Sequence, residues 1–570
     1  MSKVQKVQID DSEDAFAASA ARPLLMMALF AVLGLVALMW GLQVLAGLVG
    51  SNTGIASAVD HENNMITLAL RDEPPQLSSM KATDAISGMV LGHVMEGLLR
   101  MDMQDRLEPA IAERWEVTPE RATFWLRDNA KWSDGEPVTA HDFEFAWKTV
   151  LDPENASRYA FLLYPIKNAR KITEGEVPVE QAGVRAIDDR TLVVDLEYPT
   201  PFFDKLVTFQ TYLPAREDFY VSTNGKYGAD ADKLLYTGPF RMTDWVHGSS
   251  LYMVKNEHYW DKERINLDAI NFAYMTSDSG ARVNFFSDNK IAYTTLRAED
   301  LYRAMQNKWK IYRVQDGTLW YVEFNHRDDR ITRNKNFRKA LQLVLDMEEL
   351  VYKVTKSPGY IPGESLFPGW LMGENDYLRK EYPAKKVRLD TATAQEHLRM
   401  ALVELGLDEI PELVVLCDDS PLASTQAEWV QGTLKSKLGI DVKIDKQIFK
   451  QRLEKSLAGE FDILLPGWGP DYDDPLTFGD LFASWNVQNR GRFANEEYDA
   501  QVEIAQTSLD QGVRAAAFGR IQDIVFEEAA ILPMYERGVS YVIHPDVKNV
   551  KRRVIGAEVD FTNAYLEESD

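Results

Sequence analysis

Hydrophobic positions repeat with two different periods along most of the chain. MITLAL at 65–70 alternates in the manner of a strand, and the helical period marks segments within 84–99 and at 391–406. A further helix is predicted to begin at Thr139, because Asp142 three residues later completes a weak capping box. Both periods recur along the chain, and the pattern therefore predicts a mixed α/β protein.

The clearest alternation of elements occupies 412–468. ELVVLC, DVKIDKQ and FDILLPGW are predicted strands, and STQAEWVQGTLKSKLG and FKQRLEKSLAG between them are predicted helices. Such alternation builds a mainly parallel sheet. The stretch LLPGWGPDYDDPLTF at 464–478 therefore lies at the carboxyl end of a strand, where ligands gather in open α/β sheets. Upstream, NKNFRKALQLVLDMEELV at 334–351 is predicted to form one helix of about four to five turns.

One segment, LLMMALFAVLGLVALMWGLQVLAGLVG at 24–50, is apolar and carries no charge. A helix of this length reaches about 40 Å, enough to span the hydrocarbon core of a bilayer with some tilt. Lys3, Lys6 and Arg22 precede it, so the positive-inside rule predicts a cytoplasmic tail over 1–23. We expect a single-pass anchor in the inner (cytoplasmic) membrane, with the bulk of the chain in the periplasm or its extracytoplasmic equivalent.

The small, polar residues that follow, 51–64, are predicted to be a flexible tether. IASA at 55–58 leaves a cleaved signal peptide open as the alternative. The single cysteine, Cys417, excludes an intrachain disulfide, and no cysteine follows the apolar segment to carry a lipid. The predicted anchor is therefore made of peptide.

Size and charge narrow the class of protein. The chain of 570 residues is long enough for two or more domains, and its 45% hydrophobic content is that of a globular protein. A net charge of −25 argues against nucleic-acid binding, because phosphates would be repelled rather than neutralised.

The usual signatures of catalysis and of metal binding are absent from the sequence. There is no HExxH, GxSxG, Walker A or GxGxxG motif, and none of the eight histidines has a second histidine three or four residues on. The acidic run DYDD at 471–474 lacks the ligand spacing of a calcium loop, and its last two acids, Asp473 and Asp474, are expected to be solvated. We therefore predict neither an enzyme nor a metal or cofactor site.

Nine stretches, in order along about 66–565, together resemble one family. They are LRDEPPQLSSMKATDA at 70–85, HVMEGLLRMD at 93–102, KWSDGEPVTAHDFEFAWKTVLDP at 131–153, YTGPFRMTDW at 236–245, KNEHYWD at 255–261, EFNHRDDR at 323–330, NFRKALQLVLD at 336–346, LGIDVKI at 438–444 and PGWGPDYDDPLTF at 466–478. The set resembles the extracytoplasmic solute-binding proteins of peptide-type ABC importers, bacterial solute-binding family 5.

The resemblance implies an α/β fold, the two-lobed periplasmic-binding-protein clamp (type II) with an extra subdomain in lobe I. Segments 65–85, 212–314 and 533–570 would form lobe I, 86–211 the extra subdomain, and 315–532 lobe II. The chain would cross between the lobes at two hinges, and closure around a ligand is the expected motion.

The resemblance also implies a binding site in the GW…D segment. Asp471 would pair with the α-amino group of a bound peptide, since burying this cation is costly unless a carboxylate meets it. Trp468 would line the pocket, and Gly467 and Gly469 on either side of it would belong to the same wall.

The opposite wall is expected to be Glu73, Pro74, Pro75 and Gln76, with the peptide lying between the walls as an extra strand. The two prolines have no N–H, so Gln76 is the main-chain donor expected from this wall. Tyr159 matches a tyrosine near the ligand in the family. The resemblance assigns no residue to the ligand's carboxylate.

The expected protein is thus a monomeric, membrane-anchored peptide-binding protein that hands peptides to the permease subunits of an ABC importer. Two alternatives stay open. The same fold could bind a non-peptide solute, or the protein could be a tethered sensor or scavenger of peptidoglycan peptides without a dedicated importer.

Overall fold

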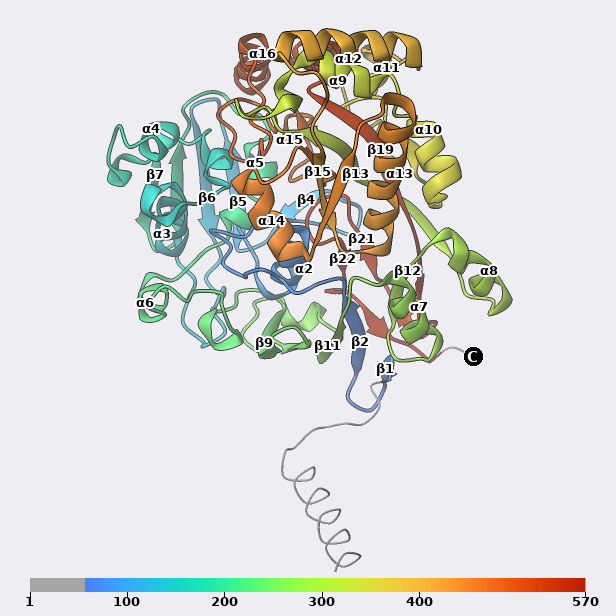
Figure 1. Cartoon of the computed structure of the whole chain (residues 1–570). Coiled ribbons are helices and arrows are strands. Elements are labelled where there is room, and N and C mark those ends of the chain that lie inside the picture. Colours follow the sequence, from blue (N-terminus) through green and yellow to red (C-terminus); the bar gives the residue numbers. More distant parts are fainter. Residues whose placement is uncertain (1–56, 569–570) are drawn as a thin grey trace, which may run out of the picture. The chain divides into compact units, whose positions relative to one another are not determined.

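The computed structural model describes residues 57–568 of the chain. The predicted tail and transmembrane anchor, 1–23 and 24–50, lie outside the described residues. Within the described range, no helix combines the length and the apolar character needed to cross a bilayer. The described residues belong to one unit, Ser57–Asp570 (Figure 1).

The first sheet of this unit has five strands and joins distant parts of the sequence. Its order is β1 (Val59–Asp60), β2 (Met65–Leu70), β11 (Ala269–Met275), β10 (Ser250–Lys255) and β9 (Phe240–Val246). The predicted strand MITLAL is β2, which runs parallel to β11. Strand β1 falls within the segment expected to be a tether, so residues 59–64 belong to the folded unit instead.

A second sheet and its covering helix follow β2 along the chain. The sheet has the order β5 (Ala112–Val117), β6 (Arg121–Leu126), β8 (Thr191–Asp195) and β7 (Val184–Asp188). Helix α3 (Ala140–Leu151) packs against it through β7 and β8. The capping box predicted at its start is confirmed, because the Thr139 N–H donates to Asp142 Oδ2 at 2.8 Å. Between β2 and this sheet lie α2 (Ala85–Val94) and a hairpin of β3 (Leu99–Met101) and β4 (Leu107–Pro109).

The third sheet is built around two strands of thirteen residues each, β13 (Tyr312–Phe324) and β19 (Ile531–Ile543). Its order is β12 (Tyr293–Leu296), β19, β13, β17 (Ile463–Leu464), β15 (Leu413–Asp418) and β16 (Val442–Gln447), with β14 (Ile361–Pro362) paired to β19 and β18 (Gly467–Trp468) paired to β13. The predicted alternation over 412–468 is confirmed, with α13 (Pro421–Leu438) and α14 (Phe449–Ala458) between the strands. The sheet is mixed. Strand β15 runs parallel to its neighbours β16 and β17, whereas β13 runs antiparallel to β17.

The predicted single helix over 334–351 is wrong. It is divided into α9 (Lys335–Gln342), α10 (Met347–Glu349) and a wide π-helical turn over Leu350–Thr355. The side chain of Asp346 accepts a hydrogen bond from the Glu349 N–H at 3.0 Å and so caps a new helix. An aspartate with this local bond competes with continuation of the preceding helix.

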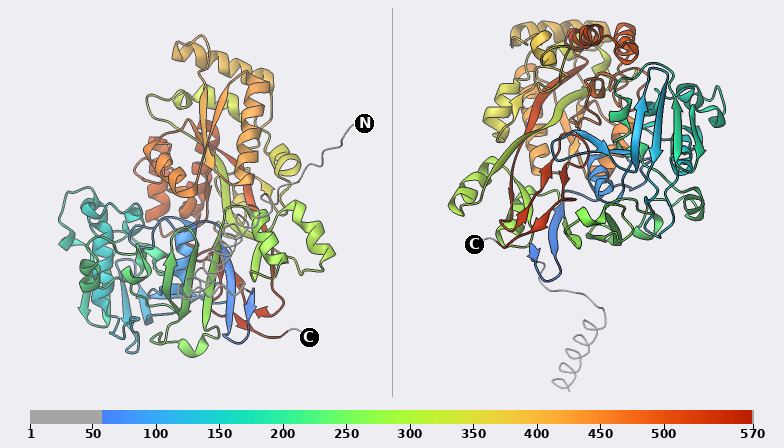
Figure 2. Two further views of the ribbon diagram at one scale, coloured as in Figure 1. Left: turned by 60° about the horizontal axis from the view of Figure 1, so that its bottom comes forward. Right: turned by 180° about the vertical axis from the view of Figure 1, so that it is seen from behind.

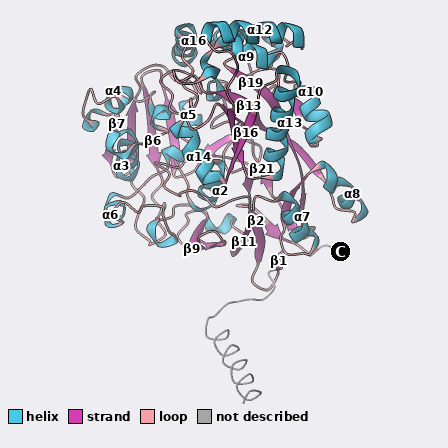
Figure 3. Ribbon diagram, viewed as in Figure 1, coloured by secondary structure: helices cyan, strands magenta, loops and turns pink. Residues whose placement is uncertain are grey.

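The remaining elements lie around these sheets. Helix α12 (Thr391–Leu405) ends, as predicted, at Gly406. Figure 3 shows α9, α12 and α13 around strands β13 and β19. The other helices are α4 (Ala169–Thr173), α5 (Phe203–Leu206), α6 (Glu217–Ser222), α7 (Ser279–Ser287), α8 (Ala298–Gln306), α11 (Leu378–Glu381), α15 (Leu476–Gly479), α16 (Glu496–Thr507) and α17 (Gln511–Glu528). Near the C-terminus, β20 (Val547–Lys548) pairs with β23 (Tyr565–Leu566), and β21 (Lys551–Arg552) pairs with β22 (Val559–Asp560).

The elements of this unit gather at two ends. The yellow and orange elements lie at one end and the blue and teal elements at the other (Figure 2, left). A separate hydrophobic core lies under β13, β15 and β16 with α9 and α13, whereas another contains β2, α2 and α3. Strands β13 and β19 run between the two ends.

Candidate functional site

A cavity of about 310 Å³ lies where both ends of the unit meet. Its wall includes the start of α2, the loop that carries Tyr159, the residues after β18 and the C-terminal segment 553–563. Of the residues predicted for the site, Tyr159, Gly467, Trp468, Gly469 and Asp471 line this cavity together.

Strand β18 sets the position of the predicted motif. Gly467 pairs with Trp320 of β13, and a Cβ atom on this glycine would lie 2.6 Å from Cε2 of the Trp320 ring. The close packing therefore requires glycine here. Beyond the strand, Thr477 holds the loop: its Oγ1 accepts from the Asp471 N–H at 2.8 Å, and its carbonyl oxygen accepts from Trp468 Nε1 at 3.1 Å.

Asp471 is a buried carboxyl group that faces the cavity. Only 6% of the surface of Asp471 is exposed, and its Oδ1 accepts a hydrogen bond from the Tyr159 hydroxyl at 3.2 Å. Burial raises the pKa of Asp471 to about 8, and the hydrogen bond from Tyr159 opposes this only in part. Among the described residues no lysine, arginine or histidine forms an ion pair with it. The site therefore favours the arrival of a cation.

The rest of the motif contacts the segment around α5. Tyr472 stacks on Phe202 with ring centroids 5.6 Å apart and an interplanar angle of 5°. Lys205 Nζ lies 2.8 Å from Asp473 Oδ2, and this pair is largely exposed. We call these two contacts, Tyr472 with Phe202 and Asp473 with Lys205, the clasp.

Asp474 was expected to be solvated, and this expectation is wrong. It is buried, and its two carboxylate oxygens accept from Arg514 of α17 at 2.7 and 2.9 Å. A bidentate guanidinium compensates for the lost hydration of the carboxylate. The half-exposed Asp473 behaves as expected.

The predicted opposite wall, Glu73, Pro74, Pro75 and Gln76, is not among the residues that line the cavity. Glu73 Oε1 lies 2.5 Å from His247 Nδ1, and Gln76 Nε2 donates to the carbonyl of Lys81 at 3.0 Å. Pro74 is buried and Pro75 half-buried. Their part in ligand binding stays a prediction.

On this side of the cavity the lining residues are Arg71, Thr83, Asp84 and Ala85. Asp84 caps α2 by accepting from the N–H groups of Ile86 and Ser87, and burial raises its pKa. Sequence reasoning overlooked it as a lining residue, although aspartate before a helical pattern is a usual N-cap signal. It also overlooked Arg490 and Arg452, which come from segments without a recognisable motif.

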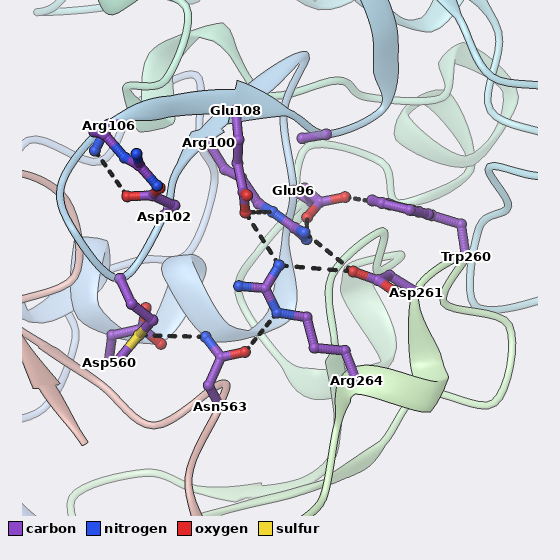
Figure 4. Close-up of polar contacts among 12 residues, drawn as sticks. Glu96, Arg100, Asp102, Arg106, Glu108, Trp260, Asp261, Arg264, Asp560 and Asn563 are labelled. Carbon is purple, nitrogen blue, oxygen red and sulfur yellow. Dashed lines mark hydrogen bonds and ion pairs between the residues drawn. The ribbon is translucent and has the colours of Figure 1, made fainter. Parts of the chain in front are cut away.

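A network of charged side chains lines the part of the cavity formed by the β3–β4 hairpin (Figure 4). Arg100 lies within 3.0 Å of carboxylate oxygens of Glu96, Glu108 and Asp261, and Arg264 also contacts Glu108 at 3.1 Å. Because each charge already has a partner of opposite sign, the network joins the hairpin to the segment after β10 rather than offering a free charge to a ligand. Within 57–568, no cluster of three or more acidic, histidine or cysteine side chains could hold a metal ion.

Two groups of elements joined by long strands, with a cavity between them and a buried carboxyl in its wall, define a solute-binding protein of the two-lobed clamp type. Comparisons with known proteins agree. Residues 106–490 match the family model of bacterial extracellular solute-binding proteins, family 5. The dipeptide-binding protein DppE of Bacillus subtilis is 31% identical over 487 residues, which cover 85% of this chain and 89% of DppE.

Solved structures are similar over most of the chain. A Listeria monocytogenes OppA bound to peptide has a TM-score of 0.83 and 31% identity, covering 89% of this chain and 100% of that one. The murein tripeptide-binding protein MppA of Escherichia coli has a TM-score of 0.82 and 26% identity, covering 90% and 100%. The unliganded open form of MppA has a TM-score of only 0.60, with 26% identity and coverage of 89% and 98%. This chain belongs to solute-binding family 5. Its backbone superimposes less well on the open form of MppA than on the other two structures.

Proposed function

We propose that this protein captures short peptides with a free amino terminus in its cavity and delivers them to an ABC importer. The observation that carries the proposal is Asp471, a carboxyl that is 6% exposed, lines the cavity and has no cationic partner in the described part of the chain. An ammonium group of the ligand would supply the missing charge.

The surroundings of Asp471 support an ammonium ligand. Tyr159 occupies one lone pair of the carboxylate, and its ring packs edge-on against Trp468 at 6.3 Å and against Phe209 at 5.3 Å. Aromatic walls exclude water and so strengthen the attraction between carboxylate and ammonium. The peptide backbone would continue along Gly469, where a Cβ atom would make only an ordinary contact, 3.6 Å from Thr318 Oγ1.

The test compares free and N-acetylated alanine peptides by titration calorimetry. Asp471→Ala is expected to weaken binding of a free-amine peptide by about two to four decades, because removing one partner of a buried pair costs about 3–5 kcal/mol. Acetylated peptide should bind poorly to the wild type and gain little from the substitution.

The matched control is Asp189→Asn, which changes a carboxylate whose side chain is 81% exposed and which lies outside the cavity wall. This variant should bind like the wild type. Equal binding of free and acetylated peptides to the wild type would contradict the role of Asp471.

Location and partners complete the proposal. The apolar segment 24–50 would anchor the protein in the inner membrane with 1–23 in the cytoplasm, so that the folded unit faces the periplasm beside a permease. Protease added to intact spheroplasts should degrade the folded unit and leave 1–23 protected. Co-purification with permease subunits would support the transport role.

The domain division is part of the same proposal. Segments 65–85, 212–314 and 533–570 would form lobe I, 86–211 its extra subdomain, and 315–532 lobe II. The clasp would then join lobe II to the extra subdomain when the cavity is closed.

A second candidate keeps the fold and changes the source of the peptide. The similarity to MppA, a murein tripeptide-binding protein, favours peptidoglycan peptides as ligands. Competition between an alanine tripeptide and a murein tripeptide for the same cavity would separate the candidates, since a murein-specific protein should prefer the latter by at least about tenfold.

A further inference from the structure

Among the residues that the structure describes, every buried arginine but one has a partner for its guanidinium. Within 57–568, six arginines are buried. Five of them have partners: Arg338 with main-chain carbonyls, Arg452 with Asp418, Arg514 with Asp474, Arg552 with Glu558, and Arg553 with Asp560. The sixth, Arg490, is 6% exposed and lines the cavity, and its Nε has no hydrogen-bond partner.

The groups around Arg490 do not neutralise it. Tyr159, Tyr321 and Glu323 lie in its electrostatic field, as does the positive charge of Arg452. Glu323 is the one acid among them, but it makes no ion pair with Arg490: its Oε1 accepts from the Gly491 N–H at 2.6 Å, and its Oε2 has no partner. Burial also raises the pKa of Glu323 to about 7, which reduces its negative charge near neutral pH. Arg490 therefore lines the cavity without an ion-pair partner among the described residues.

We propose that Arg490 is a second charged subsite of the cavity and binds a carboxylate of the ligand. A buried guanidinium without a partner is costly, and a ligand carboxylate would meet two of its N–H groups in a bidentate pair. The inference rests on the proposed function, because it completes a site for a molecule that carries both an ammonium and a carboxylate.

Tyr159 relates the two subsites to each other. Its hydroxyl donates to Asp471, and the charge of Arg490 also acts on the same phenol, whose pKa burial raises. No arginine is among the causes of the raised pKa of Asp471, so Arg490 does not serve as the partner of that carboxyl. Two subsites of opposite charge that both act on one tyrosine suit a short zwitterionic peptide, and we expect their separation to select its length.

The first arm of the test uses the wild-type, full-length chain and alanine peptides of two to five residues, each as the free acid and as the C-terminal amide. We expect one length to bind best and its free acid to bind at least about tenfold more tightly than its amide. C-terminal amides of peptides in which one alanine is replaced by glutamate show whether the bound carboxylate is a side chain or the C-terminus. If such an amide binds as tightly as the free acid, the subsite takes an acidic side chain; if it does not, the subsite takes the C-terminus.

The second arm uses variants. Arg490→Gln should weaken binding of the free acid by about 30-fold or more and bring acid and amide within about threefold of each other. Arg490→Lys should keep part of the preference for the acid. The matched control is Arg492→Gln, two residues away and exposed, which should keep the wild-type preference.

A purely structural Arg490, paired with Glu323 by a small side-chain movement, predicts something different. Arg490→Gln would then lower the thermal midpoint and weaken acid and amide equally. If the wild type binds acid and amide equally, with or without glutamate, and still rejects acetylated peptides, the carboxylate subsite is refuted and the proposed function stands. If no peptide binds the wild type, both are refuted together. The wild-type arm decides even if the Arg490 variants do not fold.

Discussion

Asp471 shows how one residue can be poised for a ligand. Its pKa is about 8, so near neutral pH the buried group holds a proton. The pKa of aspartate in an unfolded chain is about 3.9. The stability that this group contributes is therefore fully present below about pH 4 and is lost as the pH rises through about 8. A ligand cation reverses the balance by making the ionised form the favourable one.

This coupling predicts proton release on binding. At pH 6 both Asp471 and the peptide ammonium, whose pKa is about 8, are protonated before they meet, whereas their ion pair holds one proton fewer. Binding should release about one proton at pH 6, and affinity should rise close to tenfold from pH 6 to pH 7. Calorimetry in buffers of different ionisation enthalpy measures the proton count. Asp471→Asn should abolish the release, and a proton count near zero for the wild type would contradict the coupling.

At the scale of elements, the clasp combines an apolar and an ionic contact of unequal strength. Phe202 is 4% exposed, stacks on Tyr472 and lies under the guanidinium of Arg514, 5.1 Å from the ring centroid. Lys205 and Asp473 are instead exposed and screened by solvent. The aromatic contact is therefore expected to dominate the strength of the clasp.

The clasp predicts that substitutions at Phe202, just before α5, and at Lys205, within α5, change the rate of peptide dissociation by different amounts. Phe202→Ala should speed peptide dissociation by at least about tenfold, because truncating a buried phenylalanine costs about 3–5 kcal/mol. Lys205→Ala should change the dissociation rate by less than about twofold. Stopped-flow dissociation measures both rates. A larger effect of Lys205→Ala would show that the ionic contact holds the clasp.

Elements governed by local signals could be predicted from the sequence, and contacts between distant residues could not. Strand β2 and the start of α3 depend on alternation and on the Thr139–Asp142 pair, which are local. The break at Asp346 is local too, but the apolar period continues through it. Asp474 meets Arg514, 40 residues away, and Asp471 meets Tyr159, 312 residues away. The exposed or buried state of an acid depends on such partners, and the segment around Arg490 has no pattern of its own.

At the scale of the whole folded unit, β13 and β19 connect its two ends, and β13 contains a break. Gly317 has a φ of 78°, and the pairing of β13 with β19 is interrupted between Gln315 and Leu319. Beside it, Asp316 is paired with Arg537 of β19 at 2.6 Å. The break lies next to the predicted crossing between lobes at 314/315, so we infer that Gly317 is a hinge residue.

A side chain at this position should disturb closure without changing what the cavity recognises. An alanine Cβ on Gly317 would lie 2.5 Å from Cγ1 of Val554, in the C-terminal segment that lines the cavity. Gly317→Ala should weaken peptide binding by about tenfold, and the contraction seen by small-angle X-ray scattering should need correspondingly more peptide. The ratio of free to acetylated affinity should stay at the wild-type value, because Asp471 is untouched.

Gly225→Ala separates closure from simple backbone strain. Gly225 has nearly the same left-handed backbone, φ 81°, but no atom lies within 4 Å of the added Cβ. Both substitutions should therefore reduce the free energy of unfolding by at least about 1–2 kcal/mol, because alanine is strained in the left-handed region, and this loss is measured as a lower thermal midpoint without peptide. Only Gly317→Ala should also lower peptide affinity, since only there does the new methyl group meet the segment that must approach β13. If both variants bind peptide equally well, the break in β13 is a static bulge, and the motion that opens the cavity must be sought elsewhere along β19.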